Sequence, residues 1–114
     1  MTRLAIIFSL LFATPAWADN YFTYDKYKNL EEKSPSIAKF YLLGVGNAIG
    51  FTAIEFVKRG AEPIYCMPDN VGMSTSLVET AIEHVYDVYP EEMVKLPISS
   101  LAVLGLQQIF PCKK

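Results

Sequence analysis

The stretch that decides the fold spans residues 34–60 and reads SPSIAKFYLLGVGNAIGFTAIEFVKRG. Ser34 suits the N-cap of a helix and Pro35 suits its first turn. Two basic residues near the end favour the negative pole of a helix, and Gly60 can adopt the left-handed conformation that stops one. A mostly apolar set recurs at helical spacing between these signals: Ile37, Tyr41, Val45, Ala48, Ile49, Thr52 and Phe56. We therefore predict one long helix between Ser34 and Gly60.

Three glycines lie inside this stretch, at positions 44, 46 and 50. Each costs about 1 kcal/mol relative to alanine in a helix, so we expect another backbone to approach closely there. Gly46 and Gly50 also form a G-x-x-x-G spacing, which is typical of packed membrane helices. The uncharged run between Lys39 and Glu55 has only 15 residues, fewer than the roughly 20 that a span needs. Close packing inside a small bundle is therefore the better interpretation.

The N-terminus resembles a secretory signal peptide over residues 1–18. Arg3 is followed by a short apolar run over residues 4–13 and by an A-x-A cleavage site that ends at Ala18. The mature chain would then begin at Asp19, and residues 19–114 would form a single domain. Without Arg3 it carries 9 basic and 12 acidic residues, a net charge near −3. This weakly acidic balance argues against a nucleic-acid partner.

Two further helices follow a turn-rich loop over residues 61–73. The second helix is expected to start at the Ser74-Thr75-Ser76 cap, where Ser76 with Glu79 has capping-box spacing and Ser74 is an equally good N-cap. Pro90 ends this helix, and residues 91–96 form a charged connection. The third helix begins near Pro97 and is apolar nearly all round, which predicts a central position. Apolar residues of the second helix form one stripe: Leu77, Val78, Ala81, Ile82, Val85 and Tyr89.

The segment over residues 19–33 is rich in aromatic residues. Tyr21, Tyr24 and Tyr27 are spaced three apart and would lie on one face of a short helix, with Phe22 beside them. These rings either cover the open edge of the bundle or form a binding surface. With no segment of strand period, the sequence predicts an all-α, disulfide-pinned bundle of three to four helices.

The only two cysteines are Cys66 and Cys112. In an exported chain they are expected to form one disulfide. Closing a loop of this length would stabilise the fold by roughly 4 kcal/mol on the chain-entropy model. The alternative is a pair of free buried thiols.

The sequence offers little for catalysis. The single histidine, His84, lies on the polar side of the second helix with Asp87 one turn away, an arrangement typical of a solvated surface. Two cysteines and one histidine are too few for a structural zinc site. No nucleotide or nucleophile-elbow motif is present. We therefore expect a non-enzymatic protein with no cofactor and no metal.

The residue types in this chain favour a binding role over a catalytic one. The loop around Cys66 offers tyrosine and methionine, which are enriched at protein interfaces, on a segment held by the disulfide. Its alternative role is to cover the edge of the bundle. The candidate partner-binding residues are Tyr65, Met67, Pro68, Asp69 and Asn70.

Four short segments in order resemble one family. They are YLLGVG over 41–46, YCMP over 65–68, VYDVYPE over 85–91, and the helix over 101–106 that ends in FPC at 110–112. This order, behind a signal peptide, is similar to the Rap/Tai-type immunity proteins associated with type VI secretion. The resemblance covers the last two thirds of the chain. It implies a periplasmic antidote that binds a peptidoglycan amidase toxin and occludes its cleft. It matches Cys66 and Cys112 but supplies no contact residues, and a second cysteine pair of some relatives is absent.

Other functions remain open from the sequence alone. A small periplasmic chaperone of the acid-stress type would share the size, helices and single disulfide. An enzyme would need a reactive Cys66 or His84. The expected partner is a protein, an amidase effector on the resemblance, and the chain is not expected to be an integral membrane protein. The oligomeric state is undetermined, a homodimer included.

Overall fold

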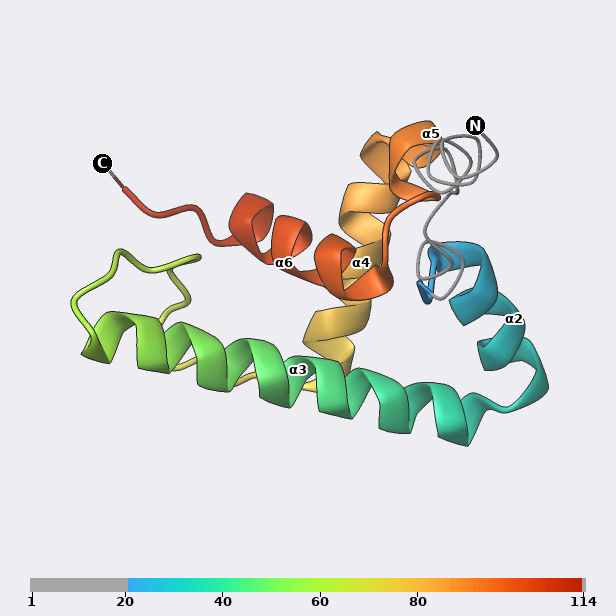
Figure 1. Ribbon diagram of the computed structural model, residues 1–114, viewed down its shortest axis with the longest axis horizontal. Coiled ribbons are helices and arrows are strands. Elements are labelled where there is room, and N and C mark those ends of the chain that lie inside the picture. Colours follow the sequence, from blue (N-terminus) through green and yellow to red (C-terminus); the bar gives the residue numbers. More distant parts are fainter. Residues whose placement is uncertain (1–20, 114) are drawn as a thin grey trace, which may run out of the picture.

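The computed structural model describes residues 21–113, and the predicted signal peptide lies outside them (Figure 1). In this part of the chain the only β contact is an isolated bridge between Thr23 and Pro97. The predicted all-α, disulfide-pinned fold is confirmed. The helices are α2 (Tyr24–Lys33), α3 (Pro35–Lys58), α4 (Thr75–Val88), α5 (Pro90–Met93) and α6 (Ile98–Ile109). The single turn α5 occupies the start of the segment that we predicted as a charged connection over residues 91–96.

The predicted limits of the long helix hold. α3 starts at Pro35 and runs for 24 residues, and Gly60 follows it with a φ of 84°. That backbone conformation strains residues with a side chain, which explains a glycine at the helix stop. Ser34 occupies the N-cap position, but its side chain makes no capping hydrogen bond.

Ser74, and not Ser76, caps α4. The backbone N–H of Leu77 donates to the Ser74 hydroxyl oxygen at 3.1 Å. The Ser76 hydroxyl oxygen receives no such bond, since Ser76 already lies inside the helix and its carbonyl accepts from the Thr80 hydroxyl at 2.8 Å. The capping-box alternative is therefore wrong.

The core lies where α6 crosses α4 (Figure 1). Ile98, Leu101, Ala102 and Leu106 of α6 are buried against Val78, Ala81, Ile82 and Val85 of α4. The backbones approach so closely that a Cβ on Gly105 would overlap the Ala81 carbonyl. The central position predicted for this helix is therefore confirmed.

Glycines in α3 do not make the close backbone approach that we predicted. A Cβ on Gly46 would meet the side chains of Val78 and Met73 at 3.1 and 3.3 Å, whereas a Cβ on Gly44 would meet nothing within 4 Å. The closest backbone approach belongs to Gly105 of α6 instead. The expectation of close packing therefore holds for one side of α3 only.

The apolar set predicted along α3 mixes two sides of the helix: Ile49 is buried and Val45 packs against the core, but the other members are exposed. Ile37, Tyr41 and Phe56 are exposed, and the buried residues are Ala38, Leu42, Gly46 and Ile49. The helix is apolar nearly all round, so helical spacing can be drawn along several faces. The side that packs combines Ala38 and Gly46 with Leu42 and Ile49, and at Gly46 it lies against the side chains of Val78 and Met73.

Two tyrosines of α2 are buried in the core, and one of them, Tyr24, joins α2 to α4. Tyr24 stacks on Tyr86 with ring centroids 3.6 Å apart and an interplanar angle of 6°. Its hydroxyl donates to a Glu83 carboxylate oxygen at 2.8 Å, and the Tyr27 hydroxyl donates to Glu31 at 2.7 Å. Both rings are buried, whereas Tyr21 is exposed. Tyr24 and Tyr27 therefore cover the edge of the core, and the three tyrosines do not form one exposed surface.

Candidate binding groove beside the disulfide loop

The loop between α3 and α4 is tied to the end of α6 at three points. Cys66 and Cys112 form the predicted disulfide, with a Cα–Cα distance of 4.9 Å. The backbone N–H of Cys66 donates to the Phe110 carbonyl at 2.9 Å, and the Gln107 side-chain amide donates to the Ile64 carbonyl at 3.2 Å. A covalent bond flanked by two hydrogen bonds restricts the loop to one position over α3.

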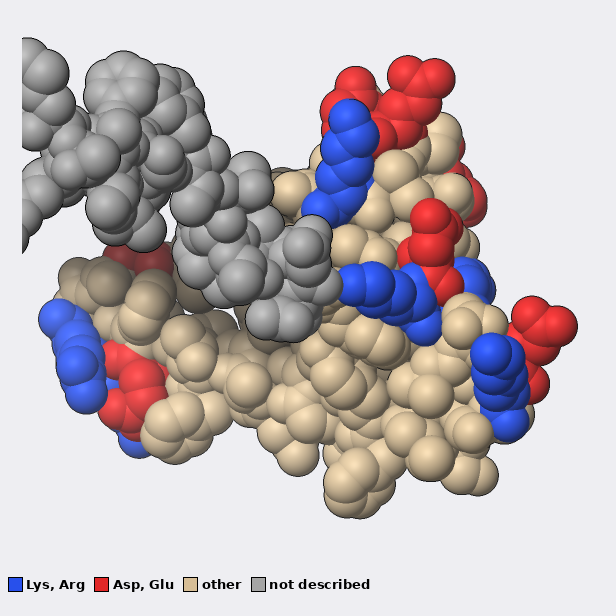
Figure 2. All heavy atoms as spheres, turned by 45° about the vertical axis from the view of Figure 1, so that its right-hand side comes forward, with Lys and Arg blue, Asp and Glu red and all other residues tan. Residues whose placement is uncertain are grey.

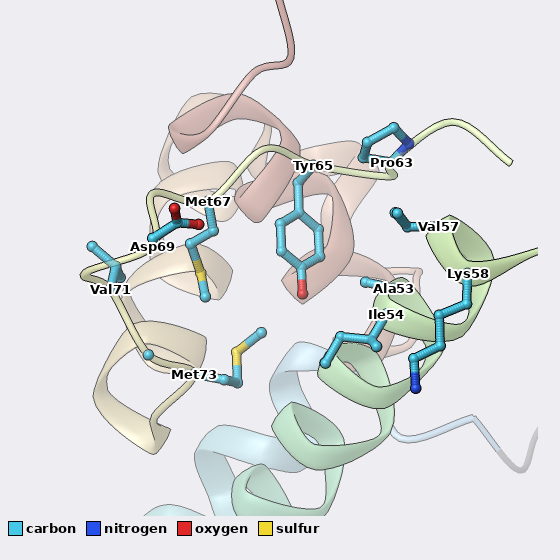
Figure 3. Close-up of a pocket in the computed structure, with 12 residues that line it drawn as sticks. Ala53, Ile54, Val57, Lys58, Pro63, Tyr65, Met67, Asp69, Val71 and Met73 are labelled. Carbon is cyan, nitrogen blue, oxygen red and sulfur yellow. The ribbon is translucent and has the colours of Figure 1, made fainter. Parts of the chain in front are cut away.

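A groove lies between this loop and the second half of α3 (Figure 3). It encloses about 580 Å³, and its lining is mostly apolar. The loop supplies Pro63, Tyr65, Met67, Asp69, Val71, Gly72 and Met73, and α3 supplies Gly50, Ala53, Ile54, Val57 and Lys58. The disulfide ties the loop that forms one side of the groove to the end of α6.

Tyr65 forms the centre of the groove wall. Its ring extends from the loop toward α3, and its hydroxyl points into the space between Met73 and Ile54 (Figure 3). Only 8% of Tyr65 is exposed, and this burial raises the pKa of its hydroxyl. The group therefore stays neutral and can donate or accept a hydrogen bond inside an apolar site.

Met67 and Met73 line one side of the groove, and Ala53 and Ile54 line the other (Figure 3). Methionine side chains are flexible and adapt to ligands of different shape. Asp69 on the loop and Lys58 on α3 place opposite charges at the two sides of the groove. This arrangement suits an apolar side chain of a partner with polar groups around it.

The predicted binding residues divide into two groups. Tyr65, Met67 and Asp69 line the groove, with Tyr65 buried and Met67 half-buried. Pro68 and Asn70 are exposed on the loop and do not line it. The loop therefore presents both a rim and a wall to a partner.

Sequence reasoning missed the α3 side of the groove and Met73. Met73 lies directly before the Ser74 cap, so its place beside the loop could have been inferred. The α3 side of the groove could not have been inferred, because the sequence does not show which face of the helix turns toward the loop. This side includes Ile54, Val57 and Lys58.

The His84 region forms a shallow polar hollow with Glu79, Thr80, Glu83 and Asp87. His84 and Asp87 are both exposed. Over residues 21–113 no group of three or more potential ligands could hold a metal ion. Neither cysteine of the chain is a free thiol, so Cys66 cannot act as a nucleophile in this state.

A charged network lies at the junction of α2 and α4. The Lys28 ammonium contacts Glu83 at 2.5 Å and Glu31 at 3.5 Å, and it lies 5.4 Å from the centre of the Tyr24 ring. Burial lowers the pKa of Lys28, but the hydrogen bond and charge of Glu83 outweigh it and the net shift is upward. Burial, followed by hydrogen bonds to Glu83 and Glu31, raises the pKa values of Tyr24 and Tyr27. The network holds α2 in place and shows no feature of a reactive site.

The outer side of α3 is apolar and exposed. Phe40 is 77% exposed, Phe51 67%, Ile54 57% and Leu43 46%. Figure 2 shows a broad surface without charged side chains, with lysine, arginine and acidic residues gathered around it. Among the described residues, α3 is the one helix long and apolar enough to cross a membrane by length and composition, and 11% of its most apolar part is buried. A single helix of this kind is weak evidence for a membrane span.

Comparison of the chain with protein-family models, with curated proteins and with solved structures finds no match.

Proposed function

We propose that this chain is a periplasmic immunity protein that binds and blocks a peptidoglycan amidase toxin delivered by type VI secretion. The observation that carries the proposal is the groove beside the disulfide loop, where a rigid rim stands next to an open apolar site. A disulfide indicates an oxidising compartment, which supports export. The four short segments that resemble Rap/Tai-type immunity proteins supply the toxin class.

Inhibition in this proposal depends on binding alone. A loop held by a disulfide and two hydrogen bonds loses little conformational entropy on binding, which favours affinity. Met67 and the exposed Pro68 and Asn70 would enter or border the toxin cleft, and the groove would receive an apolar side chain from the toxin. The net charge of −2 would assist the approach of a basic partner.

The test uses an amidase effector encoded beside this chain. Host cells that export the effector to the periplasm should lyse, and co-expression of this protein should restore growth. Met67→Asp places a charge in the apolar groove, and an affinity loss of about 30-fold or more is expected if Met67 is a central contact. Val88→Asp is the control for the added charge, because Val88 is an exposed apolar residue of α4 that lies outside the groove.

If no neighbouring amidase is bound or neutralised, the proposal fails. Equal protection by Met67→Asp and the unaltered protein would instead place the binding surface elsewhere on the chain.

One observation favours a second function, a small periplasmic chaperone of the acid-stress type. The exposed apolar side of α3 is the kind of surface that holds unfolded proteins. Such a protein should suppress the aggregation of acid-unfolded clients near pH 2–3, with increased binding of an apolar dye. An unchanged fold without suppression at that pH would exclude it.

A further inference from the structure

Tyr65 places a hydroxyl inside the groove without a partner for it. Only 8% of the residue is exposed, yet its hydroxyl makes no hydrogen bond to any residue in the range 21–113. Within that range no side-chain nitrogen or oxygen is both sealed from solvent and unpaired, so this oxygen is reached from the groove. It points into the space between Met73 and Ile54 (Figure 3). A ligand that fills the groove removes the hydroxyl from water and must therefore bring a hydrogen-bonding group of its own.

The walls beside this hydroxyl suit an aromatic ring. Met67 and Met73 line one side and Ala53 and Ile54 line the other (Figure 3). Methionine sulfur makes favourable contacts with aromatic rings. A charged group among these apolar walls would be costly, so the hydrogen-bonding group of the ring has to be neutral. The phenol of tyrosine and the indole of tryptophan meet both conditions, and a groove of about 580 Å³ has room for either.

The sides of the groove carry charges that are not equally free. The Lys58 ammonium lies 3.6 Å from a Glu55 carboxylate oxygen, which partly offsets its charge. Asp69 has no ion pair or hydrogen bond with another described residue, and its side chain is exposed. Since Asp69 and Lys58 both line the groove, its free charge is negative. A ligand with a positive charge beside its ring is therefore favoured over one with a negative charge.

We propose that the groove receives a tyrosine or tryptophan side chain of the toxin that stands next to a basic residue, and that Tyr65 selects the polar edge of this ring. The ring lies between the methionines and α3, and its hydroxyl or N–H pairs with the Tyr65 hydroxyl. The neighbouring cation faces Asp69. This assignment deepens the proposed function and rests on it for the source of the side chain, whereas the chemistry of the groove can be tested without toxin.

The first test replaces the toxin by small ligands. Tyramine and tryptamine each carry the ring and a cation, and each is titrated into the oxidised full chain while amide NMR signals are followed. Ligands of this size should bind with a Kd of about 1–5 mM and shift the signals of residues 65–73. Phenethylamine, which is tyramine without its hydroxyl, should bind about 3- to 10-fold more weakly than tyramine. A merely apolar site would give the reverse order, and this order or the failure of both ligands to bind at about 10 mM would overturn the proposal.

Tyr65→Phe removes the hydroxyl and keeps the ring. The change should not lower the stability of the chain, because the hydroxyl makes no bond to a described residue. Tyramine and phenethylamine should bind this variant equally. Tyr89→Phe is the matched control and should keep the preference for tyramine, since Tyr89 is exposed at the end of α4 and does not line the groove. A preference that survives Tyr65→Phe would contradict the role of Tyr65.

The charge beside the groove is tested with an anion of the same length as tyramine. In 3-(4-hydroxyphenyl)propionate a carboxylate replaces the ammonium, and it should bind at least about 3-fold more weakly at low salt. Asp69→Asn should narrow this difference. Asp87→Asn should not, because Asp87 is an exposed carboxylate of α4 outside the groove. Equal binding of the cation and the anion by the unaltered protein would contradict the basic neighbour.

The toxin itself separates this assignment from the proposed function. Tyr65→Phe should weaken toxin binding by about 3- to 10-fold, and Tyr89→Phe should leave it unchanged. If Tyr65→Phe binds the toxin as tightly as the unaltered protein does, the assignment is wrong while the immunity role stands. If the small ligands bind in the expected order but no toxin is bound, the immunity role fails and the toxin is not the source of the side chain.

Discussion

α6 and α3 are both apolar helices that contain glycine, yet they occupy opposite environments. Five of the twelve residues of α6 are buried, and Gly105 lies against the backbone of α4. α3 is twice as long, but only four of its 24 residues are buried. Gly44 of α3 faces open space, whereas Gly105 of α6 has no room for a side chain. Hydropathy alone therefore does not determine burial, since two apolar helices of the same chain are buried to different extents.

The largest expected effect comes from filling the contact between α6 and α4. Gly105→Leu should prevent folding, because even its Cβ would overlap the Ala81 carbonyl. Gly44→Leu is the matched control on α3 and should fold, since nothing lies near its Cβ. Circular dichroism during thermal unfolding compares the two. A cooperative transition for Gly105→Leu at the temperature of the unaltered protein would contradict the account of the core.

A smaller loss is expected when the disulfide is removed. Replacement of both cysteines by serine should lower the free energy of unfolding by about 2–5 kcal/mol. The Cys66 amide, which donates to the Phe110 carbonyl, should exchange with solvent faster than the amides of α4. Urea unfolding and hydrogen exchange measure these effects. If the loop amides of the double variant remain as protected as before, the disulfide is not what holds the groove open.

Much of the fold could be predicted from local signals. Pro35, Gly60 and Pro90 mark helix ends through backbone chemistry that depends on few neighbours. The Cys66–Cys112 bond followed from the presence of two cysteines in a chain that was predicted to be exported. α4 was assigned the correct buried side because its other side is polar, which leaves one apolar stripe.

The rest depends on contacts that one segment cannot encode. α3 is apolar on nearly every side, so its sequence does not reveal that Ala38 and Leu42 pack inward. The loop residues Tyr65 and Met67 were identified by type, but the α3 side of their groove depends on the rotation of that helix. Gly105 gave no signal that it, and not the glycines of α3, makes the close approach.

The junction of α2 with α4 should respond to alkaline pH. The pKa values of Tyr24 and Tyr27 are raised in the folded state above the ordinary value of about 10. The contribution of these two tyrosines to the free energy of unfolding is therefore complete below about pH 10. It is lost as the pH rises toward their pKa values in the folded protein. Urea unfolding should show lower stability at pH 11 than at pH 8.

Tyr27→Phe tests this assignment. At pH 7 the variant should lose about 1 kcal/mol with its hydrogen bond to Glu31. At pH 11 the difference from the unaltered protein should shrink or reverse, because phenylalanine does not titrate. If the difference in the free energy of unfolding between the variant and the unaltered protein is the same at pH 7 and pH 11, Tyr27 is not the titrating group.

The smallest expected effect is a gain on the exposed side of α3. Gly44→Ala should stabilise the fold by up to about 1 kcal/mol, because alanine favours the helix and its Cβ meets no neighbour. Gly105→Ala, the same change on α6, should destabilise the fold far more strongly, because its Cβ would overlap the Ala81 carbonyl. Urea unfolding at low micromolar concentration separates the two variants. If both variants changed the free energy of unfolding in the same direction, the contrast between the two helices would be wrong.

The central proposal is that the groove beside the disulfide loop binds the toxin, and that the exposed side of α3 around Phe51, which does not line this groove, takes no part in the contact. The most direct measurement is hydrolysis of peptidoglycan stems by the neighbouring amidase in the presence of an equal amount of this protein. The unaltered protein and Phe51→Glu should both abolish hydrolysis, and Met67→Asp should leave it largely intact. Full hydrolysis in the presence of the unaltered protein would contradict the claim, as would inhibition by Met67→Asp as strong as that by the unaltered protein.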